Sequence, residues 1–285
     1  MISRRTILAV PLLAAPACWT LRAWADDFEN AVAALERRHG GRLGVAVLDT
    51  ASGKLRAHRG DERFPLCSTF KFLAASFVLT RVDRKEESLD RRIVYGKSDL
   101  VTYSPVTEKH AGEGMTVGAI CEAAVTLSDN TAGNLLLDSF GGPAGLTVYM
   151  RSLGDDVTRL DRRETALNEA APGDPRDTTT PAAMVAALQR TVLGAALSPA
   201  SRAQLADWLV ATKTGDKRLR VGVPKGWRVG DKTGSGGHNA TNDVGVIWPP
   251  DRAPIVVAAY YVGADASDDQ RSAVLAEIGR LAASV

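Results

Sequence analysis

Ser68 and Lys71 place a hydroxyl and an amine one helical turn apart, in a segment Cys67-Ser68-Thr69-Phe70-Lys71 that precedes a long apolar stretch. A serine hydroxyl is a weak nucleophile at its free pKa and needs an adjacent base. A lysine three residues further on shares the same helix face, and desolvation lowers its pKa. The pair therefore fits covalent catalysis by an activated serine. The alternative is a solvated lysine in the first turn of an ordinary helix, because Ser-x-x-Lys arises by chance in many chains.

Three further segments carry polar groups that could work with this pair. Taken singly, each is a weak signal, since Ser-Asp-Asn between two helices is usually only a helix cap. Taken together with Ser68 and Lys71, and in this order along the chain, they predict an active site. The segments are Ser128-Asp129-Asn130, Glu164-Thr165-Ala166-Leu167-Asn168 and Lys232-Thr233-Gly234.

Strand patterns that could position these groups lie near both ends of the chain. RLGVAVLD and KLRAHR flank turn residues 50–53 and predict a hairpin, while WRVGDKTGSG, NDVGVIW and PIVVAAYYVG predict three more strands. Helices are predicted over 27–39 and from Ser267, where Gln270 completes a capping box. The simplest architecture is an α/β (α+β) fold in which the terminal helices cover one five-stranded antiparallel sheet.

Helical patterns dominate the middle of the chain. Phe70, Leu73 and Phe77 make one apolar helix face, Thr116 can cap another helix, and further helices fit 143–153, 181–192 and 199–211. We therefore expect residues 61–213 to form an inserted all-helical lobe, and residues 26–60 and 214–285 to form the sheet lobe. A cleft between two lobes is a common place for a small-molecule site.

The N-terminus has the pattern of an export signal over residues 1–25. Arg4 and Arg5 precede an apolar run over 7–17, and Ala23-Trp24-Ala25 offers a cleavage site. The paired arginines resemble a bacterial twin-arginine address. No later segment is long and apolar enough to span a bilayer. The mature protein is therefore expected to be soluble, and periplasmic or secreted.

Composition argues against several other classes of protein. The 285 residues carry a net charge of +2, with no basic stripe that would indicate nucleic acid. The histidines His39, His58, His110 and His238 are scattered, which disfavours a zinc hydrolase, so neither a metal nor another cofactor is expected. A phosphate-binding P-loop needs glycines before the lysine, whereas DKTGSGG has them after it. Gly-x-Ser-x-Gly, the signature of α/β-hydrolases, is absent.

In its four segments the chain resembles a class A serine β-lactamase. The resemblance covers essentially the whole mature chain and includes Arg162 and Asp177, which match an ion pair that closes an omega loop, at about 159–177, around Glu164. It implies the two-lobed serine β-lactamase/D,D-peptidase fold, a monomer, and hydrolysis of the β-lactam amide of penicillins and cephalosporins, hence antibiotic resistance. The implied partners are small-molecule β-lactam substrates and inhibitors.

The resemblance also implies catalytic roles. Ser68 would form an acyl-enzyme, and Ser128 would relay a proton to the leaving amine. Glu164 and Asn168 would fix a water and activate it against the acyl-enzyme. Whether Lys71 or Glu164 is the base of acylation stays open.

Other residues would bind the substrate. Asn130 matches the residue that accepts the acylamide side chain, and Lys232 and Thr233 match the pair that holds the substrate carboxylate. Gly234 would let the strand approach closely. The backbone N–H groups of Ser68 and Ser235 would form an oxyanion hole.

Several positions bear on substrate preference. Many relatives carry an arginine where this chain has Thr241, and Arg218 resembles the arginine that other members use instead; the alternative is one charge of a basic surface run. Tyr103 resembles an aromatic wall of the cleft, or is a packed loop tyrosine. The Ser235-Gly236-Gly237 run is similar to that of cefotaxime-hydrolysing members. Gly236 stands where carbapenem-hydrolysing members often have a cysteine.

Two other kinds of protein are compatible with the same motifs. A penicillin-sensitive D,D-peptidase and a β-lactam sensor that stays acylated share the Ser, Lys and Lys-Thr-Gly core. The segment from Glu164 to Asn168 argues against both, because it supplies a deacylating water.

Cys67 and Cys121 remain after the signal carrying Cys18 is removed, so one disulfide is possible by number alone. In the resembling family, the common disulfide joins the Cys121 segment to a position that is Ala75 here. That position is two helical turns, about 12 Å, from Cys67. Both thiols are therefore expected to stay reduced.

Overall fold

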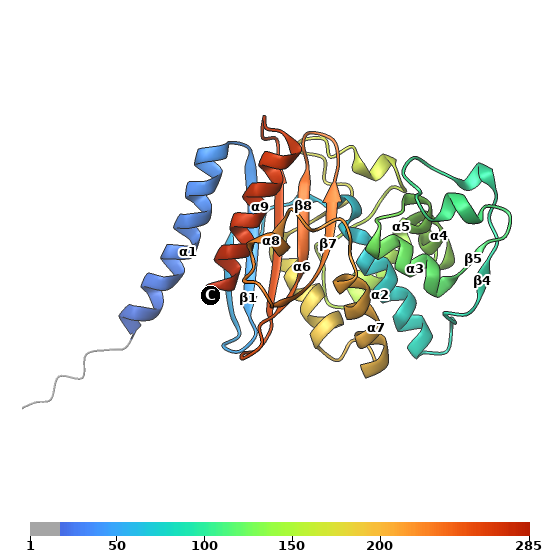
Figure 1. Cartoon of the computed structure of the whole chain (residues 1–285), viewed down its shortest axis with the longest axis horizontal. Helices are drawn as coiled ribbons and strands as arrows, with labels where there is room; N and C mark the ends of the chain where they lie inside the picture. Colours follow the sequence, from blue (N-terminus) through green and yellow to red (C-terminus); the bar gives the residue numbers. More distant parts are fainter. Residues whose placement is uncertain (1–17) are drawn as a thin grey trace, which may run out of the picture.

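A five-stranded antiparallel sheet stands at the centre of the computed structural model, which describes residues 18–285, with side chains from residue 27 (Figure 1). The strand order is β2-β1-β9-β8-β7. The strands are β1 (Arg42–Asp49), β2 (Lys54–His58), β7 (Arg228–Ser235), β8 (Thr241–Trp248) and β9 (Ile255–Val262). β9 pairs with both β1 and β8, so the last strand joins the two ends of the chain. The predicted fold class is confirmed.

Helices from both ends of the chain cover the outer face of the sheet. These are α1 (Cys18–His39), α8 (Leu219–Gly222) and α9 (Asp268–Ala283), and Val32, Leu275 and Ile278 pack in one core with the sheet. The predicted capping box of α9 is present, because Ser267 N donates to Gln270 Oε1 at 2.9 Å. α1 begins earlier than the predicted residue 27, since residues 18–26 contain neither glycine nor proline to stop a helix. The remainder of the expected export signal, residues 1–17, lies outside the described residues.

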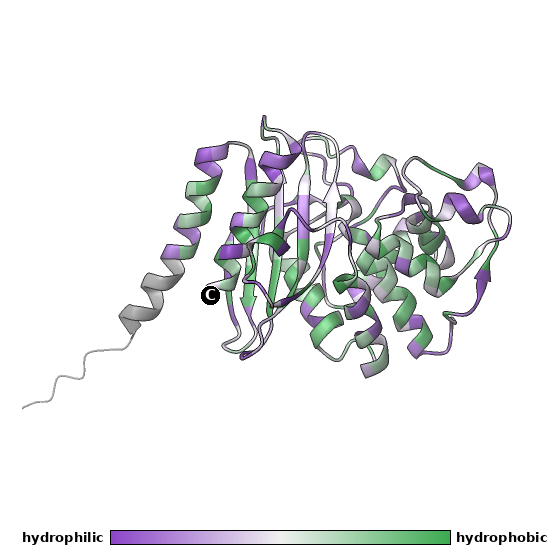
Figure 2. Cartoon of the chain, viewed as in Figure 1, coloured by the Kyte–Doolittle hydropathy of each residue, from purple (hydrophilic) through white to green (hydrophobic). Residues whose placement is uncertain are grey.

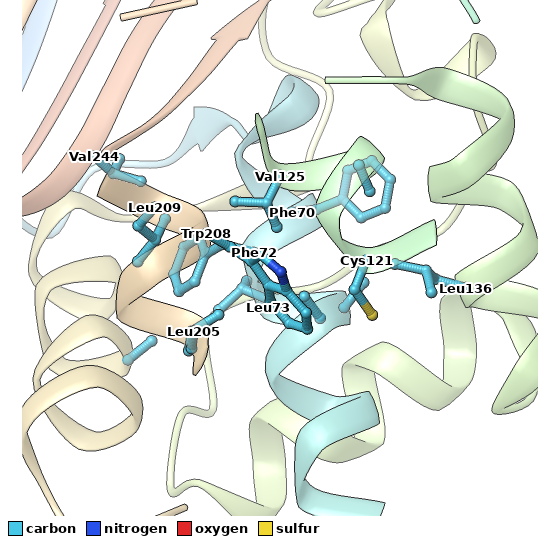
Figure 3. Packing of buried hydrophobic residues seen from close by; sticks show 14 of the residues in the cluster. Phe70, Phe72, Leu73, Cys121, Val125, Leu136, Leu205, Trp208, Leu209 and Val244 are labelled. Carbon is cyan, nitrogen blue, oxygen red and sulfur yellow. The ribbon is translucent and has the colours of Figure 1, made fainter. Parts of the chain in front are cut away.

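The other helices lie on the inner side of the sheet. They are α2 (Phe70–Asp83), α3 (Val117–Thr126), α4 (Asn130–Ser139), α5 (Gly142–Ser152), α6 (Pro181–Leu188) and α7 (Pro199–Val210). α6 and α7 contact the strands, and α3, α4 and α5 pack around α2. α2 is buried over most of its length, as a central helix must be. Figure 3 shows Phe72 and Leu73 of α2 in one core with Trp208 of α7 and Cys121 of α3. Hydrophobic residues accordingly gather on the strands and on the helices packed beside them (Figure 2).

Short elements escaped the sequence prediction. β3 (Phe64–Pro65) pairs with β6 (Thr178–Thr179), and β4 (Arg92–Ile93) pairs with β5 (Met115–Thr116). Residues 18–285 contain four 3₁₀ segments, and a π-helical segment replaces the end of the predicted helix over 181–192. Pairs of two residues carry no periodicity, so only tertiary contact reveals them. The 3₁₀ segments are Cys67–Thr69, Lys97–Asp99, Thr107–His110 and Ala166–Asn168, and the π segment is Gln189–Leu193.

Residues 18–285 contain no helix with both the length and the apolar character that a membrane span requires.

Candidate active site

Ser68 lies in the 3₁₀ turn that leads into α2, at the junction of the sheet and the helices. The side chain of Asn242 on β8 donates to Pro65 O at 2.9 Å and Leu66 O at 3.3 Å, and Thr69 Oγ1 donates to Leu66 O at 2.7 Å. These bonds fix the chain immediately before Ser68. The sheet therefore holds the start of the central helix in place.

Lys71 is a hydrogen-bond centre directly behind Ser68. Its Nζ donates to Ser68 Oγ at 2.8 Å, to Ser128 O at 2.8 Å and to Asn130 Oδ1 at 2.6 Å. Its side chain has no exposed surface. The solvated first-turn lysine considered from the sequence is wrong, because the amine is enclosed and contacts the serine hydroxyl.

Glu164 completes this group from another part of the chain. Its Oε1 lies 2.9 Å from Lys71 Nζ and 3.4 Å from Ser68 Oγ, and both charged side chains are fully buried. Burial lowers the pKa of Lys71 from its ordinary value, while the Glu164 carboxylate opposes that shift. The arrangement can pass a proton from Ser68 Oγ to either neighbour.

The omega loop is held at two levels. Near Glu164, Asn134 of α4 accepts from Glu164 N at 2.9 Å and donates to Glu164 O at 3.0 Å, and Asn168 Nδ2 donates to Glu164 Oε2 at 2.5 Å. At the loop's base, Arg162 Nε donates to Asp177 Oδ2 at 2.5 Å. The carboxylate of Glu164 is thus fixed by its backbone and by its side chain.

Three non-glycine residues beside the cleft have positive φ. The φ values are 44° at Cys67, 64° at Tyr103 and 59° at Ser128. Such backbones are costly for residues with a Cβ, and they cluster at functional sites. The conformation of Ser128 lets both its carbonyl and its hydroxyl approach Lys71.

Asp129 holds the Ser-Asp-Asn turn between α3 and α4. It caps α4 by accepting from Ala132 N at 2.8 Å, and it also accepts from Thr107 N at 2.9 Å. Asn130 Nδ2 donates to Thr102 O at 2.7 Å. The capping interpretation of this motif is therefore correct for Asp129, while Ser128 and Asn130 point their polar atoms at Lys71.

Lys232 approaches Ser128 from β7. Its Nζ donates to Ser128 Oγ at 3.0 Å and to Thr233 O at 2.8 Å. Burial, and then the neighbouring Lys71 charge, hold the pKa of Lys232 well below its ordinary value. Ser128 Oγ thus lies between two buried amines, with Lys71 Nζ at 3.4 Å.

Arg218 reaches into the cleft. It donates to Gly234 O at 2.9 Å, to Asn242 O at 2.7 Å and to Ser235 Oγ at 2.8 Å. Its neighbour Lys217 instead pairs with Asp269 on the surface. Thr241 is fully buried, and its hydroxyl accepts from Arg271.

A cavity of about 290 Å³ opens over these groups. Thr214 was missed by the sequence analysis, although its triplet Lys213-Thr214-Gly215 repeats the Lys-Thr-Gly motif. Its Oγ1 lies 2.6 Å from Thr233 Oγ1. Lys71, Glu164 and Lys232 lie behind the lining. The cavity is lined by Ser68, Tyr103, Ser128, Asn130, Asn168, Thr214, Arg218, Thr233, Gly234 and Ser235.

The two described cysteines are free and buried. Cys67 lies against Gly236, where a Cβ would come 2.7 Å from Cys67 Sγ, and burial raises the pKa of its thiol to about 12. Cys121 packs in the helical core (Figure 3). Within residues 27–285, no three His, Cys, Asp or Glu side chains gather as a metal site.

A two-lobed fold with a serine, two buried amines and a carboxylate in its cleft defines a class of serine acyl-transfer enzymes. The sequence profile of the Beta-lactamase enzyme family matches residues 27–285, and the chain belongs to that family. It is 51% identical to β-lactamase L2 of Stenotrophomonas maltophilia, over 96% of this chain and 92% of that protein. It is 46% identical to β-lactamase Toho-1 of Escherichia coli, over 98% and 96%.

Solved structures agree with this assignment. An ancestral class A β-lactamase (GNCA) superposes with a TM-score of 0.88 at 69% identity, over 89% of this chain and 98% of that one. The chain is therefore a class A serine β-lactamase, an enzyme of antibiotic resistance that hydrolyses β-lactams. The sequence prediction of family and activity is confirmed, and the D,D-peptidase and sensor alternatives are not favoured.

Proposed function

We propose that Ser68 Oγ attacks the β-lactam carbonyl and that Lys71, with Glu164, receives its proton. The observation that carries this assignment is the contact of Lys71 Nζ with both Ser68 Oγ and Glu164 Oε1. A hydrogen-bonded base next to the hydroxyl is what a serine nucleophile requires. Ser128, bonded to Lys232, returns a proton to the leaving ring nitrogen. The N–H groups of Ser68 and Ser235 bind the oxyanion.

We further propose that Glu164 and Asn168 direct the water that releases the acyl-enzyme. Glu164 Oε1 faces Ser68 Oγ at 3.4 Å, so a water beside Ser68 is within reach of a general base. Asn168 holds the other carboxylate oxygen. The release step distinguishes a turning-over lactamase from a protein that stays acylated.

The residues that line the cleft indicate how the other groups of the substrate bind. Lys232, Thr233 and Arg218 bind its carboxylate, Asn130 binds the acylamide, Gly234 lets the strand approach, and Tyr103 forms a wall. Penicillins and cephalosporins are the proposed substrates. The proposed sheet lobe comprises residues 26–60 and 214–285, and the proposed helical lobe comprises residues 61–213. The protein would be a monomer that loses residues 1–25 on export and is then periplasmic or secreted.

Acid-quenched intact-mass spectrometry tests the nucleophile. After milliseconds with benzylpenicillin, the wild type should gain the mass of one penicilloyl group, and Ser68→Ala should gain none. Ser235→Ala is the matched control, because Ser235 lines the same cavity and should leave the adduct in place. An adduct on Ser68→Ala would end the assignment.

A further inference from the structure

A second cavity, of about 480 Å³, lies behind the omega loop. We call it the omega-loop pocket. Arg42 at the start of β1 and Val262 at the end of β9 line it, together with Arg63 and Pro65. The loop segment 170–176 completes its lining. None of its lining residues also lines the cavity at Ser68. It is therefore a separate site of a size suited to small ligands.

The omega-loop pocket is lined by both apolar and basic residues. Pro65, Ala171 and Val262 supply apolar surface. Four arginines line the pocket against one carboxylate, that of Asp174. The arginines are Arg42, Arg63, Arg162 and Arg176.

Three of these arginines already have carboxylate partners, and Arg63 has none within residues 27–285. Arg42 pairs with Glu62, Arg162 with Asp177, and Arg176 with Asp174. The guanidinium of Arg63 donates only to neutral acceptors, Val157 O at 2.9 Å and Thr178 Oγ1 at 3.0 Å. Its side chain is exposed, so the charge can receive an anion from the pocket.

We propose that the omega-loop pocket binds small aromatic carboxylates, with the carboxylate on Arg63 and the ring against the apolar lining residues. A guanidinium matches a carboxylate in two parallel hydrogen bonds. Pro65, Ala171 and Val262 offer no side-chain hydrogen-bonding group, so they favour an apolar ring over a chain of polar groups. The occupant is therefore an anion with a flat apolar body.

The omega-loop pocket also borders the catalytic residues. Leu167 is fully buried and lines it, while the next residue, Asn168, lines the active-site cavity and bonds Glu164. Asn168 O also accepts from Gly237 N at 2.8 Å, beside His238 of the pocket wall. A ligand there should change kcat more than KM, a consequence that rests on the proposed role of Glu164.

Titration calorimetry with 2-naphthoate and its neutral analogue 2-naphthamide tests the site. We expect naphthoate to bind at least about tenfold more tightly than naphthamide, which corresponds to about one charge-assisted hydrogen bond. Arg63→Gln should weaken naphthoate by a similar factor, after circular dichroism has verified its fold. Ala171→Trp, which places a large side chain in the pocket and leaves the Arg63 residue itself unchanged, should also abolish binding.

Arg218→Ala is the control for binding in the active site, since Arg218 is the arginine that lines the other cavity. It should leave naphthoate affinity unchanged. Binding lost in Arg218→Ala but kept in Arg63→Gln, equal affinities for the acid and the amide, or no saturable binding would each overturn the proposal. These binding measurements do not depend on hydrolysis. They therefore test the pocket even if the role proposed for Glu164 is wrong.

Discussion

Glu164→Gln removes the proton acceptor from the deacylating group while changing its shape very little. The carboxylate has two neighbours to keep: Lys71 Nζ at 2.9 Å and Asn168 Nδ2 at 2.5 Å. A glutamine oxygen can face Lys71, and its amide can face Asn168 once the Asn168 amide turns over. That turn is feasible because Asn168 Oδ1 is buried and has no hydrogen-bond partner among the described residues. The variant should therefore fold normally.

The loss should fall mainly on release of the acyl-enzyme. General-base catalysis is worth about 10²–10⁴ in rate, or roughly 3–5 kcal/mol of barrier. Removing the carboxylate also removes the charge that raises the pKa of Lys71, so burial should lower that pKa further. A larger fraction of Lys71 is then neutral and able to accept the Ser68 proton, and acylation should suffer less than deacylation.

Stopped-flow absorbance with a chromogenic cephalosporin separates the two steps. We expect one burst, stoichiometric with enzyme, followed by turnover slower by about 10²–10⁴. Glu108→Gln, a change outside the cleft lining, is the control and should behave as wild type. A variant with no burst would mean that Glu164 is needed for acylation as well. Wild-type turnover would refute the water-activating role.

Three other predictions concern single groups. Arg218→Ala should raise KM about tenfold or more with little change in kcat, because the guanidinium is proposed to bind the substrate carboxylate; unchanged kinetics would return it to a structural role. The pKa of Lys232 lies well below 10.5, so KM should rise as the pH climbs through that lowered pKa and the ammonium loses its proton. In a pH–KM profile, Lys232→Arg should move this rise in KM to higher pH. Thiol titration of the unfolded, unreduced mature protein should find both Cys67 and Cys121 reactive, whereas finding neither would mean that they are paired.

The sequence alone determined the reaction chemistry and the class of fold. Ser68 with Lys71 indicated an activated serine, because residues three apart on a helix share one face. The apolar segments of β8 and β9, separated by turn residues, and the capping residues of α3 and α9 located most elements, because these signals are local. The four short segments, in order, predicted the family.

Only the tertiary structure decided how these groups meet. The Lys71–Glu164 ion pair joins residues 93 positions apart, and no local pattern sets its 2.9 Å separation. Arg218 belongs to the cleft rather than to the basic surface run, because the end of β7 and the start of β8 place Gly234 O and Asn242 O within its reach. Likewise, only the structure shows that Thr214 contacts Thr233 and that Arg63 has no carboxylate partner within residues 27–285. Burial and long-range packing, which fix distance and pKa, depend on the whole chain.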